Sequence, residues 1–293
     1  MINTLAFLFD KKPVGLKMNT LKIGMAQLLV EGGEPERNLS RAEQLIVNAK
    51  EKGADLVLLP ETLDFGWTHP SVYTYAEPIP GKFSDFFCAV AKKLKIWLCL
   101  GLSQNLHGKI YNSALLINQS GEIVNLYHKI NLLEVEHPFY QVGSSLQVTD
   151  TPWGKIGVNI CADNYMEALH IGKTLAHMGA QIILSPSSWT VDHSVNEEID
   201  PYNDKWIKPL SLLATLYEIP VVSTTSVGYI VGGPYMGKKM VGCSLAVHKN
   251  GNITQGEFNE FTSDLKVVEL DLGDGKWKGT EYGKMLRQKG QNF

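Results

Sequence analysis

The amino-acid sequence predicts a mixed α/β fold of the α+β type, built as one large domain. Amphipathic helices alternate with apolar strands along most of the chain, and two hairpin-like segments interrupt that alternation. The segments DLVLLPE (55–61) and QIILSPS (181–187) each follow a helix and end on a proline and a polar residue. We interpret this likeness as two similar halves, each with a mixed sheet, whose strand ends meet at a shared cleft.

The first half begins with the strand LKIGMAQLL (21–29), which a helix at 35–53 follows. That helix carries four apolar residues on one face at helical spacing. These residues are Leu39, Ala42, Ile46 and Ala49. A second helix–strand unit covers 86–105. A hairpin covers 112–129, because turn residues separate its two apolar runs.

The second half repeats this order of elements, with helix–strand units at 166–189 and 206–225 and a hairpin at 243–254. Each hairpin adds antiparallel strands to the parallel strands that the helix–strand units provide. The sequence therefore predicts mixed sheets in both halves.

No linker rich in Pro, Gly or Ser divides the chain, so we assign one domain to residues 21–272. Residues 1–20 are predicted to be a lead-in, with Met18 as an alternative translation start. Residues 273–293 form a C-terminal extension with basic charge and isolated aromatic residues. That composition suits contact with a neighbouring subunit, and a frayed tail is the alternative.

Charge and composition exclude several classes of protein. The chain has 27 basic and 30 acidic residues, a net charge of −3, which is not the footprint of binding to nucleic acid or an anionic membrane. Apolar runs such as IWLCLGL (96–102) fall well short of the roughly 18 residues that a membrane span requires. The four cysteines show no CxxC spacing, and the N-terminus has no secretory pattern. We predict a reduced, cytoplasmic protein without nucleic-acid or membrane partners.

No cofactor or metal site is predicted. The segment GGPYMGKK (232–239) has the spacing of a phosphate loop but lacks the Ser or Thr that follows the lysine in such loops. His170 and His177 lie seven residues apart on one expected helix, a spacing more typical of a stripe on the helix than of a metal pair.

Three strand ends carry the groups of a thiol hydrolase. Cys161 ends the apolar run KIGVNI, Glu61 closes DLVLLPE, and Lys129 lies in NLYHKINLLEVE. The thiolate is the attacking form of cysteine, so we expect Lys129 to lower the pKa of the Cys161 thiol and Glu61 to accept its proton. Attack on an amide carbon creates an oxyanion, for which Lys129 and the backbone N–H of Ala162 are candidate donors.

The order and separation of Glu61, Lys129 and Cys161 resemble those of the nitrilase superfamily of carbon–nitrogen hydrolases. The resemblance covers residues 20–272 and rests on LPE at the first site, YHKINL at the second and GVNIC at the third. The hairpin sequences NSALLINQSGEI and GCSLAVHKNGNI are also similar to those of the family.

This resemblance implies a four-layer α-β-β-α sandwich with two mixed sheets, which assembles as a homodimer or a larger homo-oligomer. It implies that Glu61 is the general base, Cys161 the nucleophile and Lys129 the stabiliser of the tetrahedral intermediate. A second glutamate commonly follows the family's lysine by about two helical turns. Glu136 fits that place better than Glu134. The implied mechanism uses no cofactor.

The substrate pocket is expected behind the catalytic strand ends. Phe65, Trp67 and Trp189 either form an apolar or aromatic floor there or pack in the core. Ala162 follows Cys161 in the sequence, and its side chain would shape the pocket wall beside the sulfur. Three loops after the catalytic strands are expected to enclose the pocket, at 62–81, 187–204 and 229–239.

The substrate is left open among small amides, ureido compounds and nitriles. Relatives that hydrate nitriles usually carry a tryptophan where this chain has Ala162, which favours a small amide. A nitrilase or an N-carbamoyl amidohydrolase would share the same Glu-Lys-Cys residues. An acyltransferase would pass the thioester to another acceptor. The non-enzymatic alternative is an inactive binding or scaffold homologue. The presence of all three of Glu61, Lys129 and Cys161 argues against it.

Overall fold

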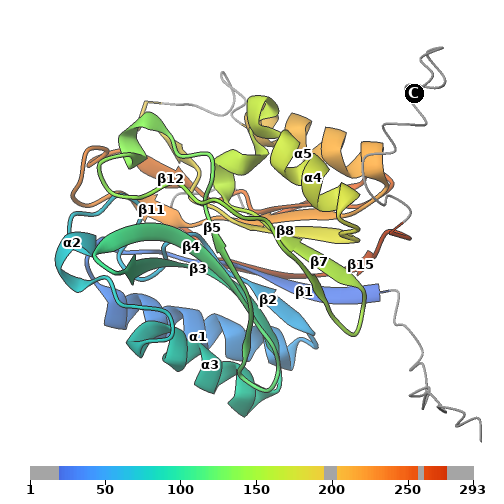
Figure 1. The fold of residues 1–293 in the computed structure, drawn as a ribbon, viewed down its shortest axis with the longest axis horizontal. Helices are drawn as coiled ribbons and strands as arrows, with labels where there is room; N and C mark the ends of the chain where they lie inside the picture. Colours follow the sequence, from blue (N-terminus) through green and yellow to red (C-terminus); the bar gives the residue numbers. More distant parts are fainter. Residues whose placement is uncertain (1–19, 195–202, 257–260, 276–293) are drawn as a thin grey trace, which may run out of the picture.

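A computed structural model of the chain describes residues 20–194, 203–256 and 261–275. Two large sheets pack against each other, and helices cover the outer face of each sheet (Figure 1). The order of layers is helix, sheet, sheet, helix. The predicted α-β-β-α sandwich with two mixed sheets is therefore confirmed.

Three neighbouring strands of the first sheet are parallel to one another. Parallel neighbours need a connection that crosses back over the sheet between one strand and the next. The remaining neighbours pair antiparallel. In spatial order the strands are β15 (Asp264–Asp271), β1 (Thr20–Gln27), β2 (Leu56–Leu58), β3 (Trp97–Leu106), β4 (Lys109–Ile117) and β5 (Ile123–His128).

The second sheet repeats this pattern of pairings. Its parallel centre is β7–β8–β10, and its other neighbours are antiparallel. In the matching order the strands are β6 (Val148–Asp150), β7 (Lys155–Val158), β8 (Ile182–Pro186), β10 (Val221–Thr224), β13 (Leu245–Val247) and β14 (Ile253–Gln255). The two predicted halves are thus alike in topology, and β2 corresponds to β8.

A small third sheet lies outside the two large ones. Its strands, in spatial order, are β11 (Val227–Tyr229), β12 (Lys239–Val241) and β9 (Thr190–Val191). This sheet joins two of the loops that were expected to enclose the pocket, because Lys239 of β12 pairs with Val191 of β9.

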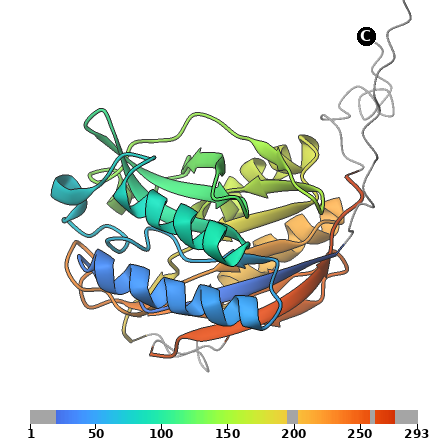
Figure 2. The same ribbon diagram turned by 90° about the horizontal axis from the view of Figure 1, so that it is seen from below.

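Helices α1 and α3 lie side by side across the first sheet (Figure 2). The apolar face predicted for the first of these helices is buried, as its period requires. Helices α4 and α5 cover the second sheet (Figure 1). The helices are α1 (Pro35–Glu51), α2 (Val72–Tyr75), α3 (Lys82–Leu94), α4 (His170–His177) and α5 (Asn203–Tyr217). Short 3-10 helices are η1 (Glu134–Glu136), η2 (Cys161–Asn164) and η3 (Met166–Ala168).

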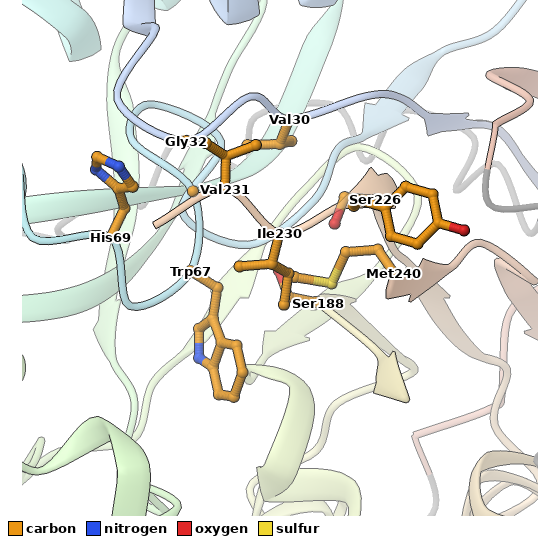
Figure 3. A pocket seen from close by; sticks show the side chains of 11 residues that line it. Val30, Gly32, Trp67, His69, Ser188, Ser226, Ile230, Val231 and Met240 are labelled. Atoms are coloured by element: carbon orange, nitrogen blue, oxygen red, sulfur yellow. The ribbon is translucent and has the colours of Figure 1, made fainter. Parts of the chain in front are cut away.

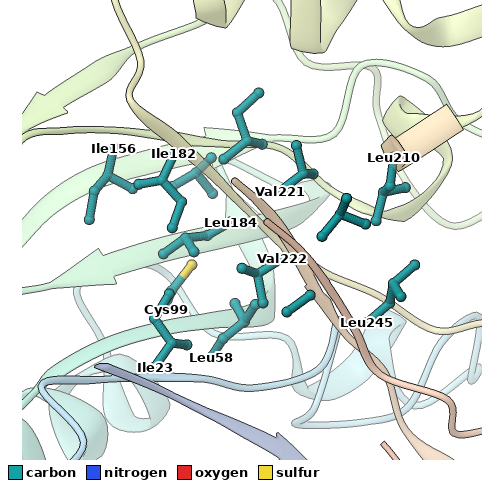
Figure 4. Close-up of a cluster of buried hydrophobic side chains, with 14 of the residues drawn as sticks. Ile23, Leu58, Cys99, Ile156, Ile182, Leu184, Leu210, Val221, Val222 and Leu245 are labelled. Carbon is teal, nitrogen blue, oxygen red and sulfur yellow. The ribbon is translucent and has the colours of Figure 1, made fainter. Parts of the chain in front are cut away.

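Alternation along the strands divides the apolar core into layers. Ile23 of β1 faces the second sheet, whereas Ala26 of the same strand belongs to the cluster beneath α1 and α3. Between the sheets, Ile23, Leu58 and Cys99 approach residues of the second sheet such as Leu184 (Figure 4). This dry layer fixes the two sheets relative to each other, so the strand ends at one edge are held together.

The expected element bounds need small corrections. The strand expected at 55–61 ends at Leu58, because the chain turns away through Pro60 before Glu61. The lead-in with Met18 lies outside the described residues, as does most of the C-terminal extension. No helix in the described part of the chain is long and apolar enough to cross a membrane.

Candidate active site

Glu61 is held where the chain leaves β2 and crosses β3. Gly101 of β3 donates its N–H to Pro60 O at 3.0 Å and accepts from Leu63 N at 3.0 Å. A Cβ at Gly101 would lie 2.5 Å from Glu61 Cα, so only glycine permits this crossing. The Glu61 side chain is fully buried as a result.

Lys129 follows β5 directly and is also fully buried. Its Nζ lies 2.8 Å from Glu61 Oε1 and 2.8 Å and 2.9 Å from the two carboxylate oxygens of Glu136. Glu136 lies in η1, and its Oε2 accepts the backbone N–H of Leu133 at 2.8 Å. Glu134 is exposed, so the structure brings Glu136 and not Glu134 to the lysine.

Asn112 of β4 completes this cluster and was not anticipated from the sequence. Its Nδ2 donates to Glu61 Oε1 at 2.6 Å and lies 3.3 Å from Glu136 Oε1. The second oxygen of Glu61, Oε2, is buried without a hydrogen-bond partner among the described residues. One oxygen of the carboxylate thus takes both donors, and the other is left as a proton acceptor.

Cys161 begins η2, three residues after β7, in a left-handed backbone conformation with φ of +42°. This conformation is costly for a residue with a Cβ, and it marks a sharp turn of the kind that presents a nucleophile. Its backbone N–H donates to Ser185 Oγ at 3.1 Å, which ties the turn to the end of β8. The backbone N–H of Ser188 lies against the sulfur.

Asp163 connects the cysteine turn to the lysine strand across the two sheets. Its Oδ2 accepts hydrogen bonds from the hydroxyl of Tyr127 at 2.7 Å and from the backbone N–H of Ile160 at 3.0 Å. Its Oδ1 accepts both the backbone N–H and the side-chain Nδ2 of Asn131 at 2.9 Å. Tyr127 and Asn131 flank Lys129 in sequence, so one carboxylate sets the position of the lysine relative to Cys161.

Burial governs the electrostatics of the cluster. Burial and the nearby Glu136 raise the pKa of Glu61, against the opposing pull of Lys129 and Asn112. Burial acts to lower the pKa of Lys129, but Glu136 and Glu61 outweigh it and hold that pKa well above the ordinary value. Lys129 therefore stays charged and serves as a fixed cation.

Lys129 does act to lower the pKa of Cys161, but the expectation that this pKa lies below its ordinary value is wrong. Burial and the Glu61 carboxylate raise the pKa of the thiol well above its ordinary value, and Lys129 and the N–H of Ser188 only partly offset them. The main physical reason is burial of the thiol, and the second is that the Glu61 carboxylate opposes the charge of Lys129. The thiol is consequently protonated at rest, and a base must remove its proton during attack.

A cavity of about 290 Å³ opens onto Cys161. Residues from all three expected loops line it. They include Trp67 from the first loop, Thr190 and Asp192 from the second, and Tyr235 and Lys238 from the third. The Asp192 carboxylate pairs with Lys238 Nζ at 3.2 Å. The remaining lining residues are Leu133, Cys161, Tyr165, Ser188, Val191 and Lys205.

The aromatic residues proposed for the pocket floor are divided by the structure. Trp67 lines the cavity, and its Nε1 donates to Glu136 Oε1 at 2.9 Å. Phe65 instead packs edge-on against Phe83, in the cluster beneath α1 and α3. Trp189 is buried in a parallel stack on Trp206, with ring centroids 4.6 Å apart, and is not among the residues that line the cavity.

Trp67 and Ser188 also line a second, smaller hollow. Figure 3 shows both residues there together with His69, Ile230 and Met240. Residues of the loops at 62–81 and 229–239 therefore line the same hollow. Ala162 is buried and, like Trp189, is not among the residues that line the cavity.

Comparison with known proteins identifies the family of this chain. The profile of the carbon-nitrogen hydrolase family matches residues 22–276. The chain belongs to the carbon-nitrogen hydrolase family. It is 30% identical to a nitrilase of Pyrococcus abyssi over 257 residues, which are 86% of this chain and 90% of that protein.

An omega-amidase of Xenopus laevis is 30% identical over 184 residues, 59% of this chain and 66% of the relative. A crystal structure of a carbon-nitrogen hydrolase from Helicobacter pylori shares the fold, with a TM-score of 0.76 and 21% identity over 94% of this chain and 96% of that chain. The similarity to the nitrilase superfamily is confirmed, and this carbon-nitrogen hydrolase is an enzyme that hydrolyses carbon–nitrogen bonds.

Proposed function

We propose that this chain is a thiol hydrolase that cleaves the carbon–nitrogen bond of a small amide through a thioester on Cys161. The observation that carries this proposal is the buried cluster of Glu61, Lys129 and Glu136 beside a cysteine that opens onto a cavity. A structural ion pair does not require a buried carboxylate oxygen without a hydrogen-bond partner, and Glu61 Oε2 has none among the described residues. A general base requires that oxygen.

In the first half-reaction, Glu61 Oε2 takes the thiol proton while the sulfur of Cys161 attacks the carbonyl carbon. The carbonyl electron pair moves to oxygen, where Lys129 Nζ and the N–H of Ala162 stabilise the negative charge. The intermediate then collapses, and Glu61 returns the proton to the departing nitrogen. Ammonia or an amine leaves, and a thioester remains.

In the second half-reaction, water enters the cavity and Glu61 takes one of its protons. The resulting hydroxyl attacks the thioester, and collapse expels the Cys161 sulfur, which regains its proton from Glu61. The acid is released. Glu136 acts throughout by holding Lys129 through both carboxylate oxygens.

An amide is favoured over a nitrile as substrate. A relative named as an omega-amidase supports amide hydrolysis, and this chain has Ala162 where relatives that hydrate nitriles usually carry a tryptophan. The cavity of about 290 Å³ suits a small substrate. A nitrilase is the second candidate, because the Pyrococcus abyssi relative is named as one. N-carbamoyl hydrolysis and acyl transfer use the same residues.

The test is a screen for ammonia release over amides, nitriles, ureido acids and glutamine. We expect at least one small amide to be turned over, and the Cys161→Ala variant to release no ammonia from it. Turnover of a nitrile alone would replace the amidase proposal with the nitrilase one. Inactivity towards the whole panel, with no covalent adduct on Cys161, would support the scaffold alternative.

We also propose that the protein assembles as a homodimer or larger homo-oligomer. Helix α5 exposes Leu212 and Leu216, one helical turn apart, at 44% and 47% of their surface. A second copy of this chain would cover them. Light scattering should give a multiple of the 32.5 kDa monomer mass, and Leu212→Glu should shift it towards the monomer. A wild-type monomer at micromolar concentration would contradict the proposal.

A cytoplasmic location and a single domain at 21–272 remain proposals. The four cysteines all lie in the described part of the chain and form no disulfide there, which suits a reducing compartment. The family profile, which matches residues 22–276, supports the proposed domain bounds.

A further inference from the structure

The asparagine beside the two catalytic carboxylates lies opposite the lysine in the β4–β5 hairpin. Lys129 N donates to Asn112 O at 2.9 Å, which extends the register in which Ser113 pairs with His128. Asn112 and Lys129 are both fully buried, and both reach the same carboxylates. The hairpin therefore delivers an amide and an ammonium group side by side to the catalytic cluster.

The two hydrogens of Asn112 Nδ2 serve two acceptors. The first acceptor is Oε1 of Glu61, 2.6 Å from Nδ2, and the second is Oε1 of Glu136, 3.3 Å from Nδ2. Asn112 Oδ1 is buried without a hydrogen-bond partner among the described residues. The opposite orientation of the amide would set this oxygen against two carboxylate oxygens, so the contacts of Nδ2 decide how the side chain lies.

These contacts make the two oxygens of Glu61 unequal. Oε1 takes the hydrogen bonds of both Asn112 and Lys129, whereas Oε2 has no partner among the described residues. The oxygen without donors holds more of the negative charge and is the better proton acceptor.

We propose that Asn112 is a positioning residue, which directs the proton of Cys161 to Oε2 of Glu61 by occupying Oε1. This inference rests on the proposed role of Glu61 as general base. Asn112 acts through Glu61 and does not itself touch the reacting atoms.

The proposal predicts a specific change in pH dependence. A donor to a carboxylate favours its charged form, and Asn112 is one of the groups that hold the pKa of Glu61 down against burial. Removing the amide should therefore raise the pH at which Glu61 becomes competent as a base. A residue that only stabilises the fold would reduce activity equally at every pH.

The test measures the rate at which iodoacetamide alkylates Cys161, as a function of pH, and so needs no substrate. Asn112→Leu keeps the shape of the side chain without its donor. Asn112→Asp keeps the shape and adds a charge, and it carries the test if the leucine variant does not fold. The matched control is Asn125→Leu on β5, because Asn125 is also buried but donates to Thr149 Oγ1 at 2.9 Å, away from the cluster.

We expect the acidic limb of the alkylation profile to move up by about one pH unit in Asn112→Leu and further in Asn112→Asp. Asn125→Leu should keep the wild-type midpoint. An unchanged midpoint in the Asn112 variants, with rates lowered equally at every pH, would overturn the proposal. Glu61→Gln separates this failure from that of the proposed function: a wild-type acidic limb that survives Glu61→Gln would instead refute the role of Glu61 as base.

Discussion

The backbone N–H of Glu61 donates to the carbonyl oxygen of Ser187 at 3.3 Å. These two residues follow Pro60 and Pro186 at the ends of β2 and β8, the corresponding strands of the two halves. The next residue, Ser188, brings its N–H to the Cys161 sulfur. A contact between equivalent strand ends therefore links the proposed base to the segment whose N–H meets the proposed nucleophile.

Replacing Glu61 with Gln should separate the acidity of the thiol from turnover. The Glu61 carboxylate helps to raise the pKa of Cys161, so its loss should lower that pKa and increase the thiolate fraction. Turnover should nevertheless fall by about 10²–10⁴ because the general base is gone. Ultraviolet titration of the thiolate and an ammonia assay measure the two effects. Glu134→Gln, at an exposed glutamate, is the control, and near-normal turnover in Glu61→Gln would contradict the assignment.

Replacing Lys129 with Met should destabilise the fold as well as stop catalysis. Two buried carboxylates would lose their shared cation, which should cost about 3–5 kcal/mol of unfolding free energy. The loss should be smaller at acid pH, because protonated glutamates need no counter-charge. Urea unfolding measures it. Lys155→Met, which breaks only an exposed pair with Asp150, should change stability little, and an equally small effect for Lys129 would count against a buried ion cluster.

Replacing Asp163 with Asn should reduce turnover without touching a reacting group. The amide that replaces one carboxylate oxygen would face N–H or O–H donors from Tyr127, Ile160 or Asn131, so the lysine strand and the cysteine turn would shift apart. Misplacement of this kind costs about 10²-fold in rate. Asp150→Asn is the control, since Asp150 is exposed. Equal turnover in the two variants would show that Asp163 does not position the site.

Asp64 should make stability depend on pH. Burial raises its pKa from 3.8 to about 7, although Ser103 and Phe65 donate to it. The native state therefore keeps a proton that the unfolded chain releases, and the contribution to stability is complete below about pH 4 and lost as pH rises through about 7. The stability of wild type relative to Asp64→Asn should thus fall between about pH 4 and pH 8. Urea unfolding that gave a constant difference would contradict this.

The sequence carries the placement of the three central residues. Each of Glu61, Lys129 and Cys161 follows an apolar strand: β2 and β5 of the first sheet, and β7 of the second. Strand ends are where sheets of α/β proteins commonly place their functional groups. The similarity of the two halves was also readable, because both end a strand on proline and a polar residue. These are local patterns, and the sandwich preserves them.

Other features depend on three-dimensional contacts that no local pattern contains. Asn112 looks like an ordinary strand residue until the hairpin register places it opposite Lys129. Phe65 and Trp67 lie in a turn with left-handed residues at Thr62, Gly66 and Thr68, where alternation no longer says which way a side chain points. The pKa of Cys161 is raised, whereas the sequence led us to expect a lowered one. The direction of this shift depends on burial and on how two glutamates share one lysine.

The central claim is that an amide passes through a thioester on Cys161, and trapping with hydroxylamine tests it most directly. With an amide that the ammonia screen identifies, hydroxylamine should intercept the thioester and yield a hydroxamate, in competition with the acid. Cys161→Ser should yield little or no hydroxamate under the same conditions. Hydroxamate formation by Cys161→Ser at the wild-type rate, or ammonia release from the amide without any trappable acyl group, would contradict the account.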